Sequence, residues 1–229
     1  MKRPALGYDD AMRTPPLEHV ELADDRHAEA ITLLAQAFHG DPPYLWLFDD
    51  PERRGRVLPR VFGGLVPLHA KHAQAYAALD EGELVGVSLW APCGLKFGVL
   101  DYLRHGLLGL LRNGIRPILR MLRLDEAYML TLAEHAAPED LYLSTIGVLP
   151  DRQGQGIGGQ MLAQHLSSEL ATNRIVWLWT NSDGNERLYT RHGFATVLRQ
   201  DYPDPRGYTA RLMRRPAGSV PAATGSNTE

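Results

Sequence analysis

Residues 148–159 read Val-Leu-Pro-Asp-Arg-Gln-Gly-Gln-Gly-Ile-Gly-Gly, and this stretch decides how the whole chain is interpreted. It follows a run typical of a strand and opens an amphipathic pattern typical of a helix. Unpaired N–H groups and the dipole at a helix start attract phosphate, and glycine lets the backbone approach its oxygen atoms. We therefore expect the loop to hold a diphosphate, with Arg152 adding a charged contact. A turn used only for packing is the alternative.

The type of diphosphate ligand depends on the context of the loop. Gly154, Gly156 and Gly159 satisfy G-x-G-x-x-G, the dinucleotide fingerprint, which makes a nicotinamide-dependent oxidoreductase one alternative. However, only about 70 residues follow the loop, too few for the rest of a doubly wound domain. The next strand ends in Trp-Thr-Asn at 179–181, without the acidic residue that would bind a ribose. No Lys-Ser/Thr pair follows, so the loop is not a Walker loop.

Two motifs give a better match. Residues 153–158 read Q-x-x-G-x-G, and residues 185–194 read N-x-x-x-Y-x-x-x-G-F. In this order and spacing they resemble the GNAT family of acetyl-CoA-dependent N-acetyltransferases, and the resemblance covers about residues 19–215. The chain also resembles the puromycin N-acetyltransferase type of this family, through Ala37-Phe38 with Asp41-Pro42, through 88–92, and through a helical insertion before 141–145.

The resemblance implies roles for individual residues. The backbone of Ile146 and Val148 would pair with the pantetheine amides, and the Val148 N–H would polarise the thioester carbonyl. Tyr189 would protonate the leaving thiolate, unless it is only a packed aromatic residue. The full set of expected acetyl-CoA contacts is Ile146, Gly147, Val148, Gln153, Gly154, Gln155, Gly156, Ile157, Gly158, Gly159 and Asn185.

The general base is where the chain departs from the family pattern. Many relatives carry a glutamate on the strand expected at 175–180, whereas this strand presents Trp177 and Trp179. Another carboxylate, a histidine acting through water, or bulk solvent must then take the proton from the amine, and Asp41 and Glu134 are candidates. We expect Asp41, Trp90 and Trp179 as substrate contacts. Helix termination by Asp41 and core packing of both tryptophans are the alternatives.

The remaining pattern predicts one α/β domain, a central and mostly antiparallel mixed sheet flanked by helices. The chain comprises a flexible arm at 1–17, an acetyltransferase domain at 18–215 with a helical insertion at 93–137, and a disordered tail at 216–229. Strands are expected at 19–23, 75–79, 84–90, 141–148, 175–180, 194–198 and 208–213, and helices at 24–38, 52–72, 156–170 and 185–192. Apolar residues at helical spacing interrupted at Gly114 and Pro117 predict two helices in the insertion.

Composition excludes other classes of function. The net charge of −3 argues against a nucleic-acid partner, and a single cysteine, Cys93, excludes an internal disulfide and a cysteine zinc cluster. His69-x-x-His72 lacks a third ligand, so no metal is expected.

No apolar run is long enough to span a membrane, and the start of the chain does not look like a secretory signal. We therefore expect a cytoplasmic protein that is a monomer or a homodimer. The predicted function is acetyl transfer from acetyl-CoA to a primary amine of a small molecule; a non-catalytic acyl-CoA-binding regulator is the main alternative.

Overall fold

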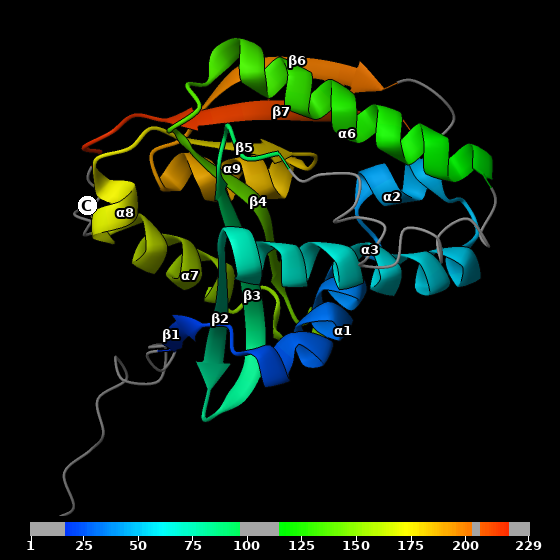
Figure 1. Cartoon of the computed structure of the whole chain (residues 1–229), viewed down its shortest axis with the longest axis horizontal. Coiled ribbons are helices and arrows are strands. Elements are labelled where there is room, and N and C mark those ends of the chain that lie inside the picture. Colours follow the sequence, from blue (N-terminus) through cyan, green and yellow to red (C-terminus); the bar gives the residue numbers. More distant parts are fainter. Residues whose placement is uncertain (1–16, 97–114, 203–206, 220–229) are drawn as a thin grey trace, which may run out of the picture.

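Seven strands form a single sheet with the order β1-β2-β3-β4-β5-β7-β6 (Figure 1). The computed structural model describes residues 17–96, 115–202 and 207–219. The strands are β1 (Glu18–Glu21), β2 (Gln74–Asp80), β3 (Glu83–Pro92), β4 (Leu141–Val148), β5 (Val176–Thr180), β6 (Ala195–Tyr202) and β7 (Tyr208–Arg215). The β4–β5 pair is parallel and the other five pairs are antiparallel. This confirms the mostly antiparallel mixed sheet and excludes the parallel doubly wound sheet that a dinucleotide fingerprint requires.

Helices cover both faces of the sheet. They are α1 (His27–Ala37), α2 (Pro42–Leu47), α3 (Pro51–His72), α6 (Ile115–His135), α7 (Ile157–Leu166), α8 (Glu169–Thr172) and α9 (Asp183–Arg191), with short 3-10 turns at Asp24–Arg26 and Pro150–Arg152. Helices α1, α3 and α6 lie on one face, and α7 and α9 lie on the other (Figure 1). Tyr142 of β4 and Trp177 of β5 face α6. The leucines next to them in the two strands, Leu141, Leu143 and Leu178, face α7 and α9.

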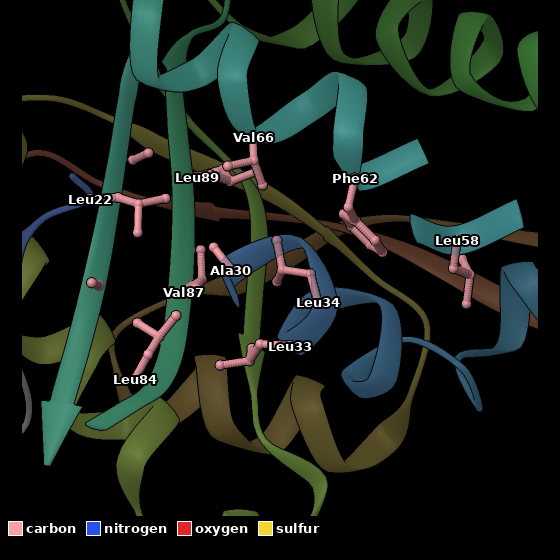
Figure 2. Packing of buried hydrophobic residues seen from close by; sticks show 12 residues of the cluster. Leu22, Ala30, Leu33, Leu34, Leu58, Phe62, Val66, Leu84, Val87 and Leu89 are labelled. Carbon is pink, nitrogen blue, oxygen red and sulfur yellow. The ribbon is translucent and has the colours of Figure 1, made fainter. Parts of the chain in front are cut away.

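The largest buried cluster joins α1 and α3 to the first half of the sheet. Leu33 and Leu34 of α1 and Phe62 of α3 pack toward Val87 and Leu89 of β3 (Figure 2). These five side chains are at most 2% exposed. Burying a leucine or phenylalanine side chain stabilises a fold by about 1.5–3 kcal/mol. This cluster therefore fixes the end of α1 against the sheet, where the chain turns into Asp41 at the start of α2.

Several expected elements differ from the structure. The helix expected at 156–170 ends at Leu166, and α8 follows after Ser167 and Ser168, because serine competes for backbone hydrogen bonds and favours helix ends. Helix α2 has no counterpart among the expected elements, because the two prolines at 42 and 43 predict only a break. In the structure they occupy its first positions, where a missing N–H costs nothing. Helix α6 runs without a break through Pro117, which lies in its first turn.

One residue of the expected arm and one of the expected tail contact the body of the domain. Leu17, assigned to the arm, is 8% exposed and packs with Ile157 and Met161 of α7. In the predicted tail, the Gly218 N–H donates to the Thr172 carbonyl at 2.8 Å. The rest of the arm, residues 1–16, the rest of the tail, residues 220–229, and the insertion residues 97–114 lie outside the described residues.

Candidate active site

Strands β4 and β5 separate halfway along their length. Their parallel pairing covers Leu141 to Leu143 and stops there, although β4 continues to Val148. The β3–β4 register shifts at the same point, because Thr145 and Leu143 face consecutive residues of β3 and Ser144 is left out. A bulge of this kind bends a strand and increases its twist. The end of β4 is therefore paired only with β3 and leaves a gap on the β5 side.

The gap exposes backbone groups of β4. The Leu149 N–H donates to Val85 at 3.0 Å, on the β3 side. Because successive residues of a strand direct their amides to opposite sides, the amides of Ile146 and Val148 point toward the gap. The Gln153 side chain donates to the Val148 carbonyl at 3.1 Å and fixes the start of the glycine loop. That these two amides pair with a pantetheine arm stays a prediction.

The glycine loop places a helix N-terminus beside this gap. Gly154 and Gly156 have φ values of 77° and 83°, in the left-handed region, and Gly156 is the N-cap of α7. A Cβ at either position would meet no atom within 4 Å, so the backbone there is open to a ligand. Gly158 and Gly159 follow in the first turn, where amide N–H groups have no partner within the helix. This glycine-lined helix start is suited to a diphosphate.

The sequence predicts that Arg152 contacts the diphosphate, but in the structure its side chain is bound elsewhere. Its guanidinium forms an ion pair with Asp80 at the end of β2, and its Nε donates to Gln155 at 3.1 Å. The arginine therefore holds the loop against the β2–β3 hairpin. The charge available to a diphosphate at this loop is then the partial charge of the α7 amides.

A cavity of about 430 Å³ begins at the gap. Ile146 of β4 lines it, as do Asn185 and Tyr189 of α9. Tyr189 is 5% exposed, and its ring contacts Phe194 at a centroid distance of 5.8 Å. Burial, and then the charge of Asp41, raise the pKa of Tyr189 above its ordinary value, so the phenol keeps its proton at neutral pH. A protonated hydroxyl at this position can donate to a leaving thiolate.

Asp41 lies on the wall of the same cavity, at the N-cap of α2. Its carboxylate makes no side-chain hydrogen bond to the start of α2. Desolvation raises the pKa of Asp41 to about 7, which is close to the value that suits a general base at neutral pH. The other candidate, Glu134, lies exposed on α6 and is not among the residues that line the cavity.

The two expected substrate tryptophans have different surroundings. Trp179 lines the cavity and stacks on Tyr128 of α6, with ring centroids 4.5 Å apart. Trp90 is 0% exposed, stacks on His165 at 3.9 Å and donates to Ser88 at 3.0 Å, all within the core. Trp90 does not line the cavity, because it points to the α7 face of the sheet. The structure therefore brings Trp179, but not Trp90, to the site.

Sequence reasoning missed several polar residues of the cavity, among them an aspartate and a threonine. Asp125 of α6 lines it, and desolvation raises the pKa of this carboxyl. Thr180 at the end of β5 also lines it; the residue is 3% exposed, and its Oγ1 has no hydrogen-bond partner within the described residues. An acidic residue within an otherwise apolar helical stripe was the available signal for Asp125. Thr180 gave no signal, because threonine is ordinary in a strand.

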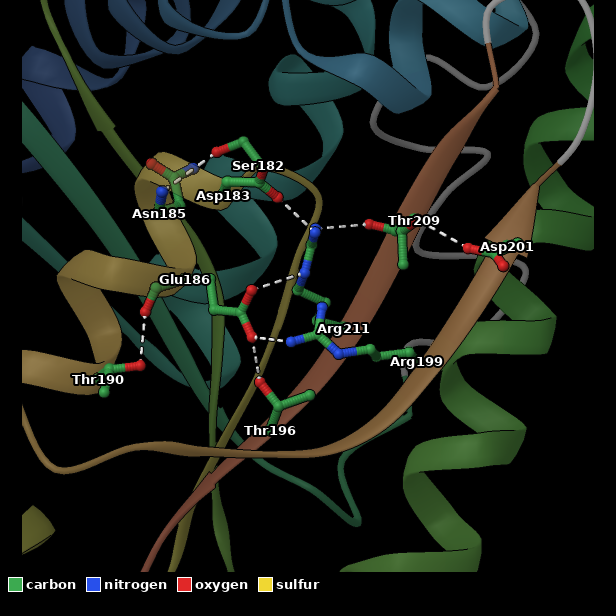
Figure 3. Close-up of polar contacts among 10 residues, drawn as sticks. All are labelled: Ser182, Asp183, Asn185, Glu186, Thr190, Thr196, Arg199, Asp201, Thr209 and Arg211. Atoms are coloured by element: carbon green, nitrogen blue, oxygen red, sulfur yellow. Dashed lines mark hydrogen bonds and ion pairs between the residues drawn. The ribbon is translucent and has the colours of Figure 1, made fainter.

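Helix α9 is held to the sheet by a network of charged groups (Figure 3). Glu186 accepts from Thr196 and Arg199, both at 2.6 Å, and forms an ion pair with Arg211 at 2.8 Å. The Thr196 hydrogen bond and the two arginines lower the pKa of Glu186. Glu186 follows Asn185 directly and precedes Tyr189 by one turn. The network therefore fixes the helix that carries both expected site residues.

In the part of the chain that the structure describes, no group of three or more histidine, cysteine or acidic side chains is arranged to hold a metal ion. Within the same residues, no helix is both long enough and apolar enough to span a bilayer.

Comparison with known proteins agrees with this architecture. The family model described as an acetyltransferase (GNAT) domain matches residues 124–196, from α6 to the start of β6. The ribosomal protein bS18-alanine N-acetyltransferase of Salmonella typhimurium is 35% identical over 81 residues, 33% of this chain and 54% of that protein. The chain thus spans about half the length of this curated relative.

Solved structures share the fold. A Corynebacterium glutamicum protein described as histone acetyltransferase HPA2 and related acetyltransferase aligns with a TM-score of 0.63 and 20% identity, covering 91% of this chain and 99% of that one. Arylalkylamine N-acetyltransferase 2 from Aedes aegypti aligns with a TM-score of 0.60 and 15% identity, covering 87% and 98%. At these identities the likeness concerns the fold alone.

Proposed function

We propose that this chain, which carries a GNAT acetyltransferase domain, transfers an acetyl group from acetyl-CoA to a primary amine of a small molecule. One observation carries the proposal. The gap between β4 and β5 opens into a cavity that reaches the exposed β4 backbone, Tyr189 and Asp41. A thioester arm lying in the gap and an amine lying in the cavity would meet beside Tyr189.

The cofactor would be held mainly by backbone groups. Gly154 to Gly159 would bind the diphosphate at the start of α7, and the amides of Ile146 and Val148 would pair with the pantetheine arm. Asn185, which lines the cavity from α9, would contact the same arm. These donors are fixed by the sheet and the helix, so they need little reorganisation when the ligand binds.

In the reaction, the amine nitrogen would attack the thioester carbonyl carbon, and the carbon–sulfur bond would break. The Val148 N–H would stabilise the negative charge that develops on the carbonyl oxygen. The Tyr189 hydroxyl would donate its proton to the departing thiolate. Holding amine and thioester in one cavity would supply most of the acceleration through orientation.

Acetyl-CoA turnover over a panel of primary amines tests the proposal. Tyr189→Phe should lower kcat by at least 10-fold while the Kd for acetyl-CoA stays within about 2-fold, because the hydroxyl acts after binding. Tyr76→Phe is the matched control, since Tyr76 is a partly buried tyrosine of β2 outside the cavity lining. Equal kcat values for wild type and Tyr189→Phe would remove Tyr189 from the mechanism.

A non-catalytic acyl-CoA-binding regulator is the second candidate. The observation that favours it is the absence of a carboxylate on β5, whose side chains are Val176, Trp177, Leu178, Trp179 and Thr180. Such a protein would bind acetyl-CoA in calorimetry but acetylate no amine of the panel. Turnover of any amine above the uncatalysed rate would exclude it.

A further inference from the structure

Three exposed leucines lie on the outer side of α6. Leu119, Leu122 and Leu130 are 45%, 42% and 61% exposed, and the described residues include only two more exposed large apolar side chains, Val20 and Val197. At 3.6 residues per turn, positions 119, 122 and 130 share one side of the helix. The opposite side packs on β5, β6 and β7 (Figure 1). Single exposed apolar residues are ordinary, but a group on one helix side indicates an interaction surface.

The charged residues of α6 follow an order that is unusual for a helix. Residues 116–123 carry three arginines and no acidic residue, and residues 125–134 carry three acidic residues and no lysine or arginine. The helix dipole favours the reverse order, with acidic groups near the N-terminus and basic groups near the C-terminus. Arg116 in the first turn and Glu134 in the last are exposed, and neither forms an ion pair with another described residue. The charge order therefore does not stabilise an isolated α6.

A second copy of α6 that runs antiparallel matches both features. A two-fold axis midway along the helix, between positions 124 and 125, places Leu119 opposite Leu130 of the partner subunit. The same axis places Arg116 beside Glu134 of the partner subunit, and symmetry makes each contact occur twice. The basic N-terminal half of each helix then lies along the acidic C-terminal half of the other, so the charges are complementary.

An anionic membrane surface fits this side of α6 less well than a second copy does. Helices that lie on membranes are rich in Lys and Arg on their polar face, whereas the second half of α6 is acidic. The cavity also stays separate from this surface, because α6 lines it with residues such as Leu124 and Tyr128 from the other side of the helix. A copy of this chain is therefore the partner whose charges the surface itself specifies.

We propose that the outer side of α6 is the interface of a homodimer in which two α6 helices pack antiparallel. Leu119, Leu122 and Leu130 form its apolar contacts, and Arg116 and Glu134 form its ion pairs. Helix α6 has 21 residues and is about 30 Å long, so the interface is at the small end for protein pairs and the dimer dissociates on dilution. The inference does not depend on the proposed acetyltransferase function, since none of these residues lines the cavity.

Reversal of single charges tests the antiparallel arrangement. Sedimentation velocity of the full chain, between about 1 and 200 μM, measures the Kd of the dimer. Arg116→Glu, or Glu134→Arg, turns both ion pairs into repulsions and should raise this Kd at least 10-fold. The two positions lie about 27 Å apart along one helix and do not contact each other within a chain. Restoration of the Kd to within about 3-fold, by the double variant or by an equimolar mixture of the two single variants, can then come only from contacts between copies.

The matched control is Arg187→Glu, the same charge reversal at an exposed residue of α9 on the other face of the sheet, which should leave the dimer Kd unchanged. Leu130→Gln should raise the Kd at least 5-fold. Thermal melts of each variant, at a concentration where wild type is monomeric, should match wild type and show that the fold is kept.

Two results would refute the proposal, a wild-type chain that stays monomeric over the whole concentration range and a dimer that the double variant does not restore. A monomer that binds phosphatidylglycerol vesicles, and loses this binding in Leu130→Gln, would assign the surface to a membrane and overturn the proposal as well. None of these results bears on acetyl transfer, which the amine panel tests separately.

Discussion

Replacing Asp41 by asparagine should make the free energy of unfolding of the protein less dependent on pH. Desolvation raises the pKa of this carboxyl to about 7 from an ordinary value of 3.8. The folded chain therefore binds more protons than the unfolded chain between these values, and stability falls as the pH rises from about 4 to about 7. A shift of about 3 units, at about 1.4 kcal/mol per unit, corresponds to a loss of at most about 4 kcal/mol. Water in the cavity reduces this figure.

Urea unfolding of the ligand-free protein at pH 4 and at pH 8 measures the effect. Wild type should lose more free energy of unfolding over this interval than Asp41→Asn, by up to about 4 kcal/mol, and Asp41→Asn should be the more stable protein at pH 8. Glu126→Gln, on the surface, should keep the wild-type dependence. Parallel pH profiles for wild type and Asp41→Asn would refute the argument. The same pKa predicts that wild-type kcat/KM rises with pH through about 7, because the base must be ionised.

Three further substitutions, with Gly55→Ala as a control, test how the site is held. Glu186→Gln should lower the free energy of unfolding by about 1–2 kcal/mol in urea titrations, because the ion pair with Arg211 loses its charge. Gly156→Ala should weaken acetyl-CoA binding in calorimetry and cost about 1 kcal/mol through its positive φ, whereas Gly55→Ala, in an open helical position, should stabilise by about 0.5–1 kcal/mol. Gly147→Ala should lower Tm, because its Cβ would lie 2.7 Å from a leucine of α1.

The sheet was largely predictable because its signals are local. All seven strands and α1, α3, α7 and α9 lie within a few residues of their expected bounds, except at the C-terminal ends of α7 and β6. Alternation, helical spacing and turn residues act over short distances, which is why they could be found. The helix that the sequence did not predict, α2, also begins with a local signal, but this signal fits two structures. Pro42 and Pro43 fit both a break and a helix start, and which of these occurs depends on packing of α2 against α6, which no short pattern encodes.

Part of the candidate site was accessible to sequence reasoning for the same reason. The glycine loop and the Asn185–Tyr189 spacing are contiguous motifs. Asp125 and Thr180 were not found, because α6 and β5 are some 50 residues apart and meet only at the cavity. Trp90 and Trp179 have similar sequence surroundings, yet the strand face on which each lies places one in the core and the other at the site. The register shift of β3 and β4 beside Trp90 has no clear signature in the sequence.

The tryptophans of β5 explain why a base is needed elsewhere. Trp177 is 3% exposed and donates to the buried Asp140 at 2.8 Å, and Trp179 stacks on Tyr128, so both rings fix α6 and the strand end to the sheet. A glutamate at either position would lose that packing. Because β5 holds α6, the carboxylates that line the cavity come from the turn before α2 and from α6. Asp41, in that turn, is the one whose charge acts on Tyr189. In the proposed reaction, base and acid would approach the thioester from opposite faces of the sheet, through the gap between β4 and β5.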